Sequence, residues 1–107
     1  LTDVSVIALS RSEKLKRLVS LNLSKNNITD AGAKALADSS SLGKLKKLDL
    51  NFNRIGDEGA HAIASSSNFS NLESLKLGQN KIGTEGAQAL NESKTLQNLA
   101  HPVFGFY

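Results

Sequence analysis

The two histidines, His61 and His101, are the residues of this chain best suited to catalysis or metal binding. A Ser–His–Asp site needs a histidine beside an activated serine, and a metal site needs several ligands at close spacing. Neither histidine belongs to a His-x-x-x-His pair or to a carboxylate cluster, and the chain contains no cysteine. The sequence therefore predicts no catalytic residue, no metal site and no cofactor.

The neighbouring carboxylates of Asp57 and Glu58 have the composition of an acid–base pair, and the glycines Gly56 and Gly59 that flank them are typical of phosphate loops. The aspartate and the second glycine recur at a fixed interval earlier in the chain, as Asp30 and Gly32. Recurrence at a fixed interval indicates a structural role in every copy, so we interpret the pair as the start of a helix. We do not expect the protein to be an enzyme.

The whole chain is an internal repeat. Shifted by the interval that separates Leu21 from Leu48, the sequence matches itself without gaps in one register. The matching sets are Leu21, Leu48, Leu75; Leu23, Leu50, Leu77; Asn26, Asn53, Asn80; Ile28, Ile55, Ile82; and Gly32, Gly59, Gly86. Self-similarity of this kind is the signature of a solenoid, in which successive copies stack and bury a continuous core.

Each repeat is expected to contain one short strand and one short helix. The alternation Leu21-Asn22-Leu23 has the two-residue period of a strand, whereas Ala33, Leu36 and Ala37 have helical spacing. A residue with a side-chain oxygen stands just before each expected helix, where we expect it to cap the free backbone N–H groups of that helix. These residues are Asp3, Asp30, Asp57 and Thr84.

The asparagines Asn26, Asn53 and Asn80 are predicted to have a structural role. The corner between strand and helix leaves backbone groups that no sheet partner satisfies, and each would cost about 1–3 kcal/mol if buried unpaired. An amide side chain offers both a donor and an acceptor, so it can bond the backbone of its own and neighbouring turns. We expect the three amides to form a ladder inside the solenoid.

These repeats resemble a known family. The segment 45–60 reads Leu-x-x-Leu-x-Leu-x-x-Asn-x-Ile-Gly-x-x-Gly-Ala, and is similar to a leucine-rich repeat of the ribonuclease-inhibitor-like subfamily; segments 72–87 and 18–33 follow the same pattern, with Thr29 in place of the first glycine. The resemblance implies an α/β solenoid, a short horseshoe segment with parallel strands on its concave face and helices on its convex face. It also implies binding to proteins, and the family includes a GTPase activator and ubiquitin-ligase recognition parts. The absence of cysteine argues against ribonuclease inhibition itself.

We expect a single domain over residues 1–107. Residues 1–14 would form an N-terminal half-repeat helix, 15–96 three repeats, and 97–107 an edge strand and cap. Pro102 favours an edge strand, and Phe104, Phe106 and Tyr107 would cover the open end of the core. A truncated or frame-shifted end is the alternative interpretation. Because the chain starts at Leu1 without Met, we expect an upstream part.

The candidate binding surface is the concave strand face. Its residues alternate with the buried leucines: Ser20, Asn22, Ser24, Lys47, Asp49, Asn51, Ser74, Lys76 and Gly78, with Lys25, Phe52 and Gln79 just beyond. Phe52 is the aromatic residue of this set, and exposed aromatics are favoured binding anchors. The alternative is a Phe52 side chain packed against the descending loop near Arg54.

The expected face is small. Four strands of about five residues would present on the order of 300 Å², whereas a standard interface needs about 800 Å² per partner. The chain would therefore belong to a longer array, bind weakly, or also use its loops and edges.

The leading hypothesis is a non-catalytic protein–protein interaction module whose partner is an unidentified protein. The alternatives are a regulatory or substrate-recognition part of an enzyme system, of the GTPase-activator or ubiquitin-ligase-adaptor type, and a self-associating structural unit. The absence of cysteine and of a signal-peptide pattern favours an intracellular location.

The net charge is +3, and many cations fall around two equivalent loops: Lys14, Lys16, Arg17, Lys44, Lys46 and Lys47. We interpret these cations as a solvated face, because a nucleic-acid module would show a stronger basic stripe with stacking aromatics. A nucleic-acid partner is therefore not expected. No run of about 18 apolar residues occurs, so a membrane partner is not expected either.

The first helix differs from the others on its outer face. Val4 and Ile7 stand where the later helices have polar residues or alanine, and they are three residues apart, hence adjacent on a helix. A solvated terminal repeat should have a polar outer face. We expect these two side chains to meet an upstream segment or, weakly, a second copy of the chain.

Overall fold

The computed structural model describes residues 2–99, which form a regular alternation of helix, 3₁₀ turn and strand. The α-helices are α1 (Asp3–Ser10), α2 (Asp30–Ala37), α3 (Asp57–Ala64) and α4 (Thr84–Asn91). The strands are β1 (Ser20–Asn22), β2 (Lys47–Asp49) and β3 (Ser74–Lys76). A 3₁₀ turn precedes each strand: η1 (Glu13–Leu15), η2 (Ser40–Leu42) and η3 (Ser67–Phe69). Each kind of element recurs at the interval that the sequence repeat predicts.

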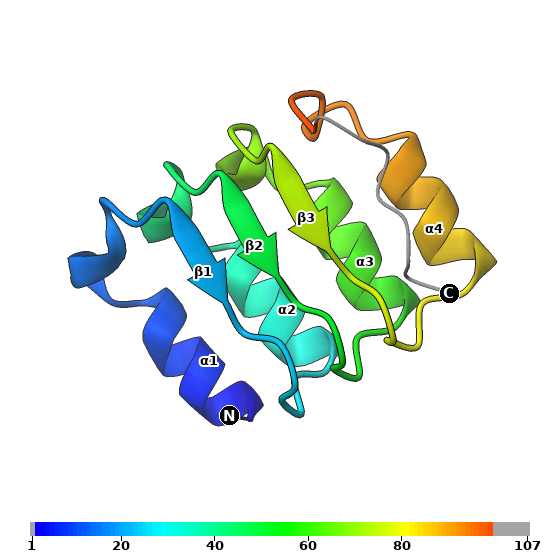
Figure 1. Cartoon of the computed structure of the whole chain (residues 1–107), viewed down its shortest axis with the longest axis horizontal. Coiled ribbons are helices and arrows are strands. Elements are labelled where there is room, and N and C mark those ends of the chain that lie inside the picture. The colour runs from blue at the N-terminus through cyan, green and yellow to red at the C-terminus, as the bar shows by residue number, and fades with distance from the viewer. Residues whose placement is uncertain (1, 100–107) are drawn as a thin grey trace.

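The strands form one parallel sheet in the order β1-β2-β3. The register pairs Leu21 with Leu48 and Leu48 with Leu75, so equivalent residues of successive repeats lie side by side. Figure 1 shows the three strands in one row and the helices in a second row that covers one face of the sheet. The predicted α/β repeat solenoid is confirmed; it is a short, open segment.

The core lies between the sheet and the helices. Its largest fully buried side chains come from every repeat: Val6, Ile28, Leu36, Leu42, Leu45, Leu48, Leu50, Ile55, Ile63, Phe69, Leu72 and Leu77. Burial of such a side chain contributes about 1.5–3 kcal/mol. Because short strands and eight-residue helices are marginal alone, this shared burial between neighbouring repeats holds them in place.

The aspartates cap helices in a different way from the one that the sequence suggests. Each is the first residue of its helix, yet its carboxylate accepts hydrogen bonds from the next repeat. Oδ1 of Asp30 accepts from the backbone N–H of Gly56 (2.7 Å) and Gly59 (3.0 Å). Asp57 accepts in the same way from Gly83 and Gly86, and Asp3 from Thr29 and Gly32. The expectation that each aspartate caps its own helix is therefore wrong.

The reason lies in the N-cap positions themselves. The residues before α3 and α4 are Gly56 and Gly83, which have no side chain to cap with, and Thr29 before α2 makes no cap bond to its own helix. The orphan N–H groups at a helix start still need acceptors. The preceding repeat supplies them, so each cap also joins two repeats.

A second set of cross-repeat bonds satisfies the other end of the helices. The hydroxyls of Ser39, Ser66 and Ser93 donate to the backbone carbonyls of Ser10, Ala37 and Ala64 at the end of the preceding helix. These bonds were not predicted from the sequence, although the three serines occupy the same position in successive repeats. Both ends of α2 and both ends of α3 are thus capped by the neighbouring repeats.

We expect Asp30→Ala to lower the free energy of unfolding by about 2 kcal/mol, because two N–H groups at the start of α3 lose a charged acceptor. The matched control is Thr84→Ala. Thr84 stands at the same repeat position, is exposed and makes no side-chain hydrogen bond within residues 2–99, so its loss should change stability by less than about 0.5 kcal/mol. Urea titrations of both variants measure the difference, and equal midpoints would contradict the capping role.

The two ends of the chain were expected to differ from the repeats. Val4 is 78% exposed, whereas Ile7 is only partly exposed and lines a groove between α1 and α2 with Ala31 and Ala35. The apolar outer face therefore consists of Val4 and part of Ile7, and its contact with another surface stays a prediction. The predicted edge strand and cap fall on residues 97–107, of which 100–107, including Pro102, Phe104, Phe106 and Tyr107, lie outside the described residues. Residues 97–99 contain no strand.

Candidate functional site

The face of the sheet opposite the helices carries the polar residues that the sequence assigns to the concave surface. Ser20, Asn22, Lys47 and Lys76 are exposed, and Asp49 and Ser74 are half-buried. Together they line a shallow depression of about 260 Å³ that spans all three strands. The structure thus brings six of the predicted residues into one surface.

The remaining predicted residues lie in the turns that follow the strands. Ser24, Asn51 and Gly78 are half-buried, and side chains of this region bond the backbone of the turns. Oδ1 of Asn51 accepts from Gly78 N (2.6 Å), and Oδ1 of Asp49 accepts from Asn51 N (3.0 Å). These polar groups therefore hold the turns in shape. The side chains of Ser20, Lys47, Ser74 and Lys76 make no hydrogen bond within the described residues.

Three residues at the end of this face have a left-handed backbone. The φ angles are 60° at Lys25, 58° at Phe52 and 57° at Gln79. This conformation costs a residue other than glycine roughly 1–2 kcal/mol. The turn requires it, because the N–H groups of Lys25 and Phe52 continue the sheet by donating to the carbonyls of Asn51 and Gly78 (2.9 Å each).

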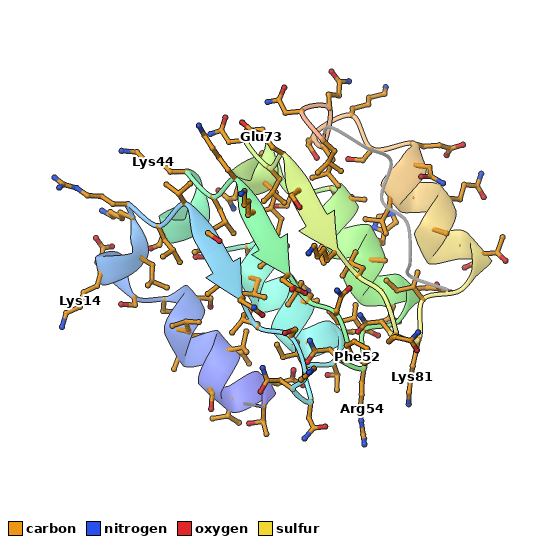
Figure 2. The ribbon with its side chains drawn as sticks, in the orientation of Figure 1. Lys14, Lys44, Phe52, Arg54, Glu73 and Lys81 are labelled. Atoms are coloured by element: carbon orange, nitrogen blue, oxygen red, sulfur yellow. The ribbon has the colours of Figure 1, made fainter. Side chains whose placement is uncertain are left out.

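Phe52 is 52% exposed and therefore presents part of its ring to solvent. The sequence left two alternatives, an exposed ring or a ring packed against the descending loop near Arg54, and this exposure is closer to the first. Figure 2 shows Arg54 and Lys81 projecting from the same edge of the molecule, where the strands end. Lys81 was not among the residues predicted from the sequence. Its signal is the repeat position, because Asn27, Arg54 and Lys81 are equivalent in successive repeats and each lies just beyond a left-handed position.

Asn26, Asn53 and Asn80 each follow directly after one of the left-handed residues, and their side chains are buried or half-buried. Oδ1 of Asn53 accepts from Ile28 N (3.1 Å), and its Nδ2 donates to Leu23 O, Leu50 O and Asn51 O (3.0–3.3 Å). Asn80 makes the same bonds one repeat later: its Oδ1 accepts from Ile55 N, and its Nδ2 donates to Leu50 O. Asn26 donates to Leu23 O and Ser24 O. The amides thus bond the backbone of their own repeat, and those of Asn53 and Asn80 also bond the preceding repeat.

The sheet face is smaller than the sequence suggests. The described residues form three strands of three residues, not four of about five. With strands about 4.8 Å apart and a rise of 3.3 Å per residue, this face presents on the order of 140 Å². A partner of ordinary interface size must therefore contact the surrounding turns as well.

Residues 2–99 contain neither a metal-binding cluster nor a membrane-spanning helix. No group of three or more histidines, aspartates or glutamates in this part of the chain could hold a metal ion. None of its helices has the length and apolar character needed to cross a membrane. His61 is exposed on α3, at the outward position that the repeat predicts, and His101 lies outside the described residues.

Comparison with known families decides the identity of the repeats. Residues 16–61 match a family model of leucine-rich repeats in two copies, and residues 70–90 match a leucine-rich repeat model. The chain is a leucine-rich-repeat protein. The two matches together cover more than half of the chain and include all three strands. No curated protein matches the sequence.

Leucine-rich repeats generally mediate protein–protein interaction and are typically non-catalytic. The matches identify the chain as leucine-rich repeats and do not assign a subfamily. The leucines of the motif are buried in the core in the second and third repeats, and Leu18 and Leu21 of the first repeat pack against it partly buried. The residues between these leucines form the sheet face. In this leucine-rich-repeat protein the motif therefore accounts for the scaffold, and the variable positions carry what is specific to the chain.

Proposed function

We propose that this leucine-rich-repeat protein is a non-catalytic binding module that holds a protein partner across the sheet face and the adjoining turn at Phe52. The observation that supports the proposal most is the placement of Phe52. The ring is half-exposed on a backbone with φ 58°, a conformation unfavourable to a bulky side chain. The equivalent turns have Lys25 and Gln79, so folding does not require an aromatic residue there.

The surroundings of Phe52 suit a protein partner. Arg54 and Lys81 lie on the same edge, and the sheet face beside it has lysines and serines with no hydrogen bond within the described residues. An aromatic ring with polar residues around it is the usual composition of a binding hot spot and its rim. We infer that Phe52 fills a pocket of the partner while the strand residues bond its polar groups.

Phe52→Gln tests this proposal, because Gln79 already occupies the equivalent turn at φ 57° and the variant should fold as the wild type does. Ligands are first selected from a random displayed peptide library on the immobilised wild-type chain. We expect Phe52→Gln to weaken the selected peptides at least about tenfold, since anchors of this type dominate binding energy. Isothermal titration measures the affinities.

The control is Lys34→Gln on α2, which places at position 34 the residue that the chain has at Gln88. Lys34 is exposed on the helix side and should leave the affinities unchanged. Peptides that lose affinity for Lys34→Gln but bind Phe52→Gln normally would move the binding site to the helices and contradict the proposal.

A further inference from the structure

The edge of the molecule where the strands begin is strongly basic. We call the following exposed residues of the η1–β1 and η2–β2 segments the basic rim: Lys14, Lys16, Arg17, Lys44, Lys46 and Lys47. They are six of the 13 lysines and arginines in a chain whose net charge is +3. Figure 2 shows Lys14 and Lys44 on this edge and Glu73 further along it. The positive charge is therefore concentrated over two neighbouring repeats.

Few carboxylates neutralise the basic rim. Glu13 pairs with Lys16 (2.6 Å), and this is the one ion pair within residues 2–99. Glu73 belongs to the third repeat, at the end of the basic rim. Arg17 and Lys44 occupy equivalent positions of successive repeats, and adjacent parallel strands are about 4.8 Å apart, so these two cations are close enough to repel one another. An anionic ligand would relieve this repulsion.

The scaffold does not need these cations. The residues equivalent to Arg17 and Lys44 in the later repeats are Asn71 and Asn98. Nδ2 of Asn71 donates to Gly43 O, and Nδ2 of Asn98 donates to Ser70 O (2.8 Å each). At this position asparagine therefore makes a bond between repeats, and the first two repeats have a cation instead. That difference points to a role of the cations outside folding.

An exposed apolar side chain lies within the basic rim. Val19 is 48% exposed, and its carbonyl accepts from the N–H groups of both Lys46 (2.7 Å) and Lys47 (3.0 Å) of the next repeat. Val19 is thus flanked by cations on its own strand segment and on the neighbouring one. A ligand that fits this surface has negative charges around an apolar group.

We propose that the basic rim binds an acidic protein segment, rich in aspartate or glutamate, with an apolar side chain that covers Val19. This inference rests on the proposed function, because it names the chemistry of the protein partner. The basic rim is continuous with the polar sheet face through Lys47, which lines the depression beside Ser20 and Ser74. Their hydroxyls can bond a peptide backbone, whereas no aromatic residue of the basic rim offers a base a stacking surface.

The test uses a fluorescent peptide of eight glutamates with one leucine at its centre, measured by anisotropy on the purified chain. The double variant Arg17→Asn with Lys44→Asn removes two cations and places the asparagine found at Asn71 and Asn98. We expect this variant to bind the peptide about tenfold more weakly than the wild type, with a weaker dependence on salt. Melting by circular dichroism verifies that the variant folds.

The matched control is Lys34→Gln with Lys94→Ser, which removes the same charge elsewhere and uses residues found at equivalent positions of other repeats, Gln88 and Ser67. We expect less than about a twofold change in affinity, because neither lysine belongs to the basic rim and salt screens exposed charges that do not contact the ligand. Equal losses in the two double variants would show a general charge effect and overturn the proposal. Failure of the wild type to bind the peptide in low salt would also overturn it.

A double-variant cycle tests the apolar contact even if the asparagine variant is unstable. Replacing the central leucine of the peptide by serine should weaken binding to the wild type about threefold, but should not weaken binding to Val19→Ser. Additive losses would contradict a contact with Val19. Phe52→Gln should leave binding of this peptide unchanged, so failure of the basic rim and failure of the Phe52 surface are separable.

Two further probes decide the class of ligand. A twenty-nucleotide oligothymidylate and vesicles of phosphatidylcholine with phosphatidylserine present anionic groups without a polypeptide. We expect both to bind more weakly than the acidic peptide at equal concentration of negative charge. Tighter binding of either probe would assign the basic rim to nucleic acid or to membrane and overturn the proposal.

Discussion

Asn53→Ala should lower the free energy of unfolding by about 3 kcal/mol. The side chain is 7% exposed and makes four hydrogen bonds to backbone groups. Two of these groups, Ile28 N and Leu23 O, belong to the preceding repeat. Alanine leaves Ile28 N without an acceptor, and an unsatisfied buried group costs about 1–3 kcal/mol. The three carbonyls lose one donor each. The expected loss is less than the sum over all four bonds, because the three carbonyls keep a second donor. Leu23 O and Leu50 O accept from the amides of Asn26 and Asn80, and Asn51 O accepts from Lys25 N.

The measurement is the midpoint and slope of urea unfolding, with Asn27→Ala as the control. Asn27 follows the same turn in the first repeat, is exposed and makes no side-chain hydrogen bond within residues 2–99. Its substitution should change stability by less than about 0.5 kcal/mol. Because the bonds of Asn53 join two repeats, we also expect a smaller unfolding slope if the repeats separate. A loss as small as that of Asn27→Ala would contradict the ladder.

The repeat period explains how far the sequence alone predicts the fold. Leu48 and Leu50 are both buried, as the pattern predicts, because a two-residue period fixes which side chains lie on one face of a strand. A single repeat interval then assigns every later element. What the period predicts well is therefore the identity and order of the elements.

The direction of the aspartate caps shows where sequence reasoning fails. A carboxylate at a helix start normally caps its own helix, and Asp30 has the expected local sequence. The partners of Asp30 are instead Gly56 and Gly59, in the next repeat. No local rule contains that separation, since it depends on how two repeats stack. Gly56 and Gly83 at the N-cap positions of α3 and α4 were the sequence signal for this arrangement, because glycine has no side chain with which to cap its own helix.

The candidate site was predictable only in part. Alternation along the strands places Lys47 and Lys76 on the sheet face, and the structure agrees. Alternation does not indicate that Asn51 is half-buried and bonds Gly78 N, nor that Val19 is exposed among cations. Both facts depend on the shape of the turns, in which backbone direction no longer follows a two-residue period. The turns therefore had to be seen before surface and scaffold could be separated.

Gly59→Ala should destabilise the chain by about 3 kcal/mol, although alanine is the better helix former. Within an exposed helix the same change would stabilise by up to about 1 kcal/mol. Here an added Cβ would lie 2.7 Å from Oδ1 of Asp30 and 2.7 Å from Cγ2 of Ile55. Overpacking of this kind costs about 1–3 kcal/mol. Displacement of the carboxylate also weakens its bonds to Gly56 N and Gly59 N, which raises the cost further.

Gly43→Ala is the matched change with the opposite expected sign. Gly43 has φ −64° and ψ −19°, close to Lys16 and Ser70 at the equivalent positions, so any residue can adopt its backbone. An added Cβ would lie 3.7 Å from its nearest neighbour, the backbone oxygen of Ser40, which is an ordinary van der Waals distance. Alanine restricts the unfolded chain there and should stabilise the fold by about 0.4–1 kcal/mol. Thermal melts that move both variants in the same direction would contradict the close contacts at Gly59, with Asp30 of α2 and with Ile55 of its own repeat, because Gly43 has no contact this close.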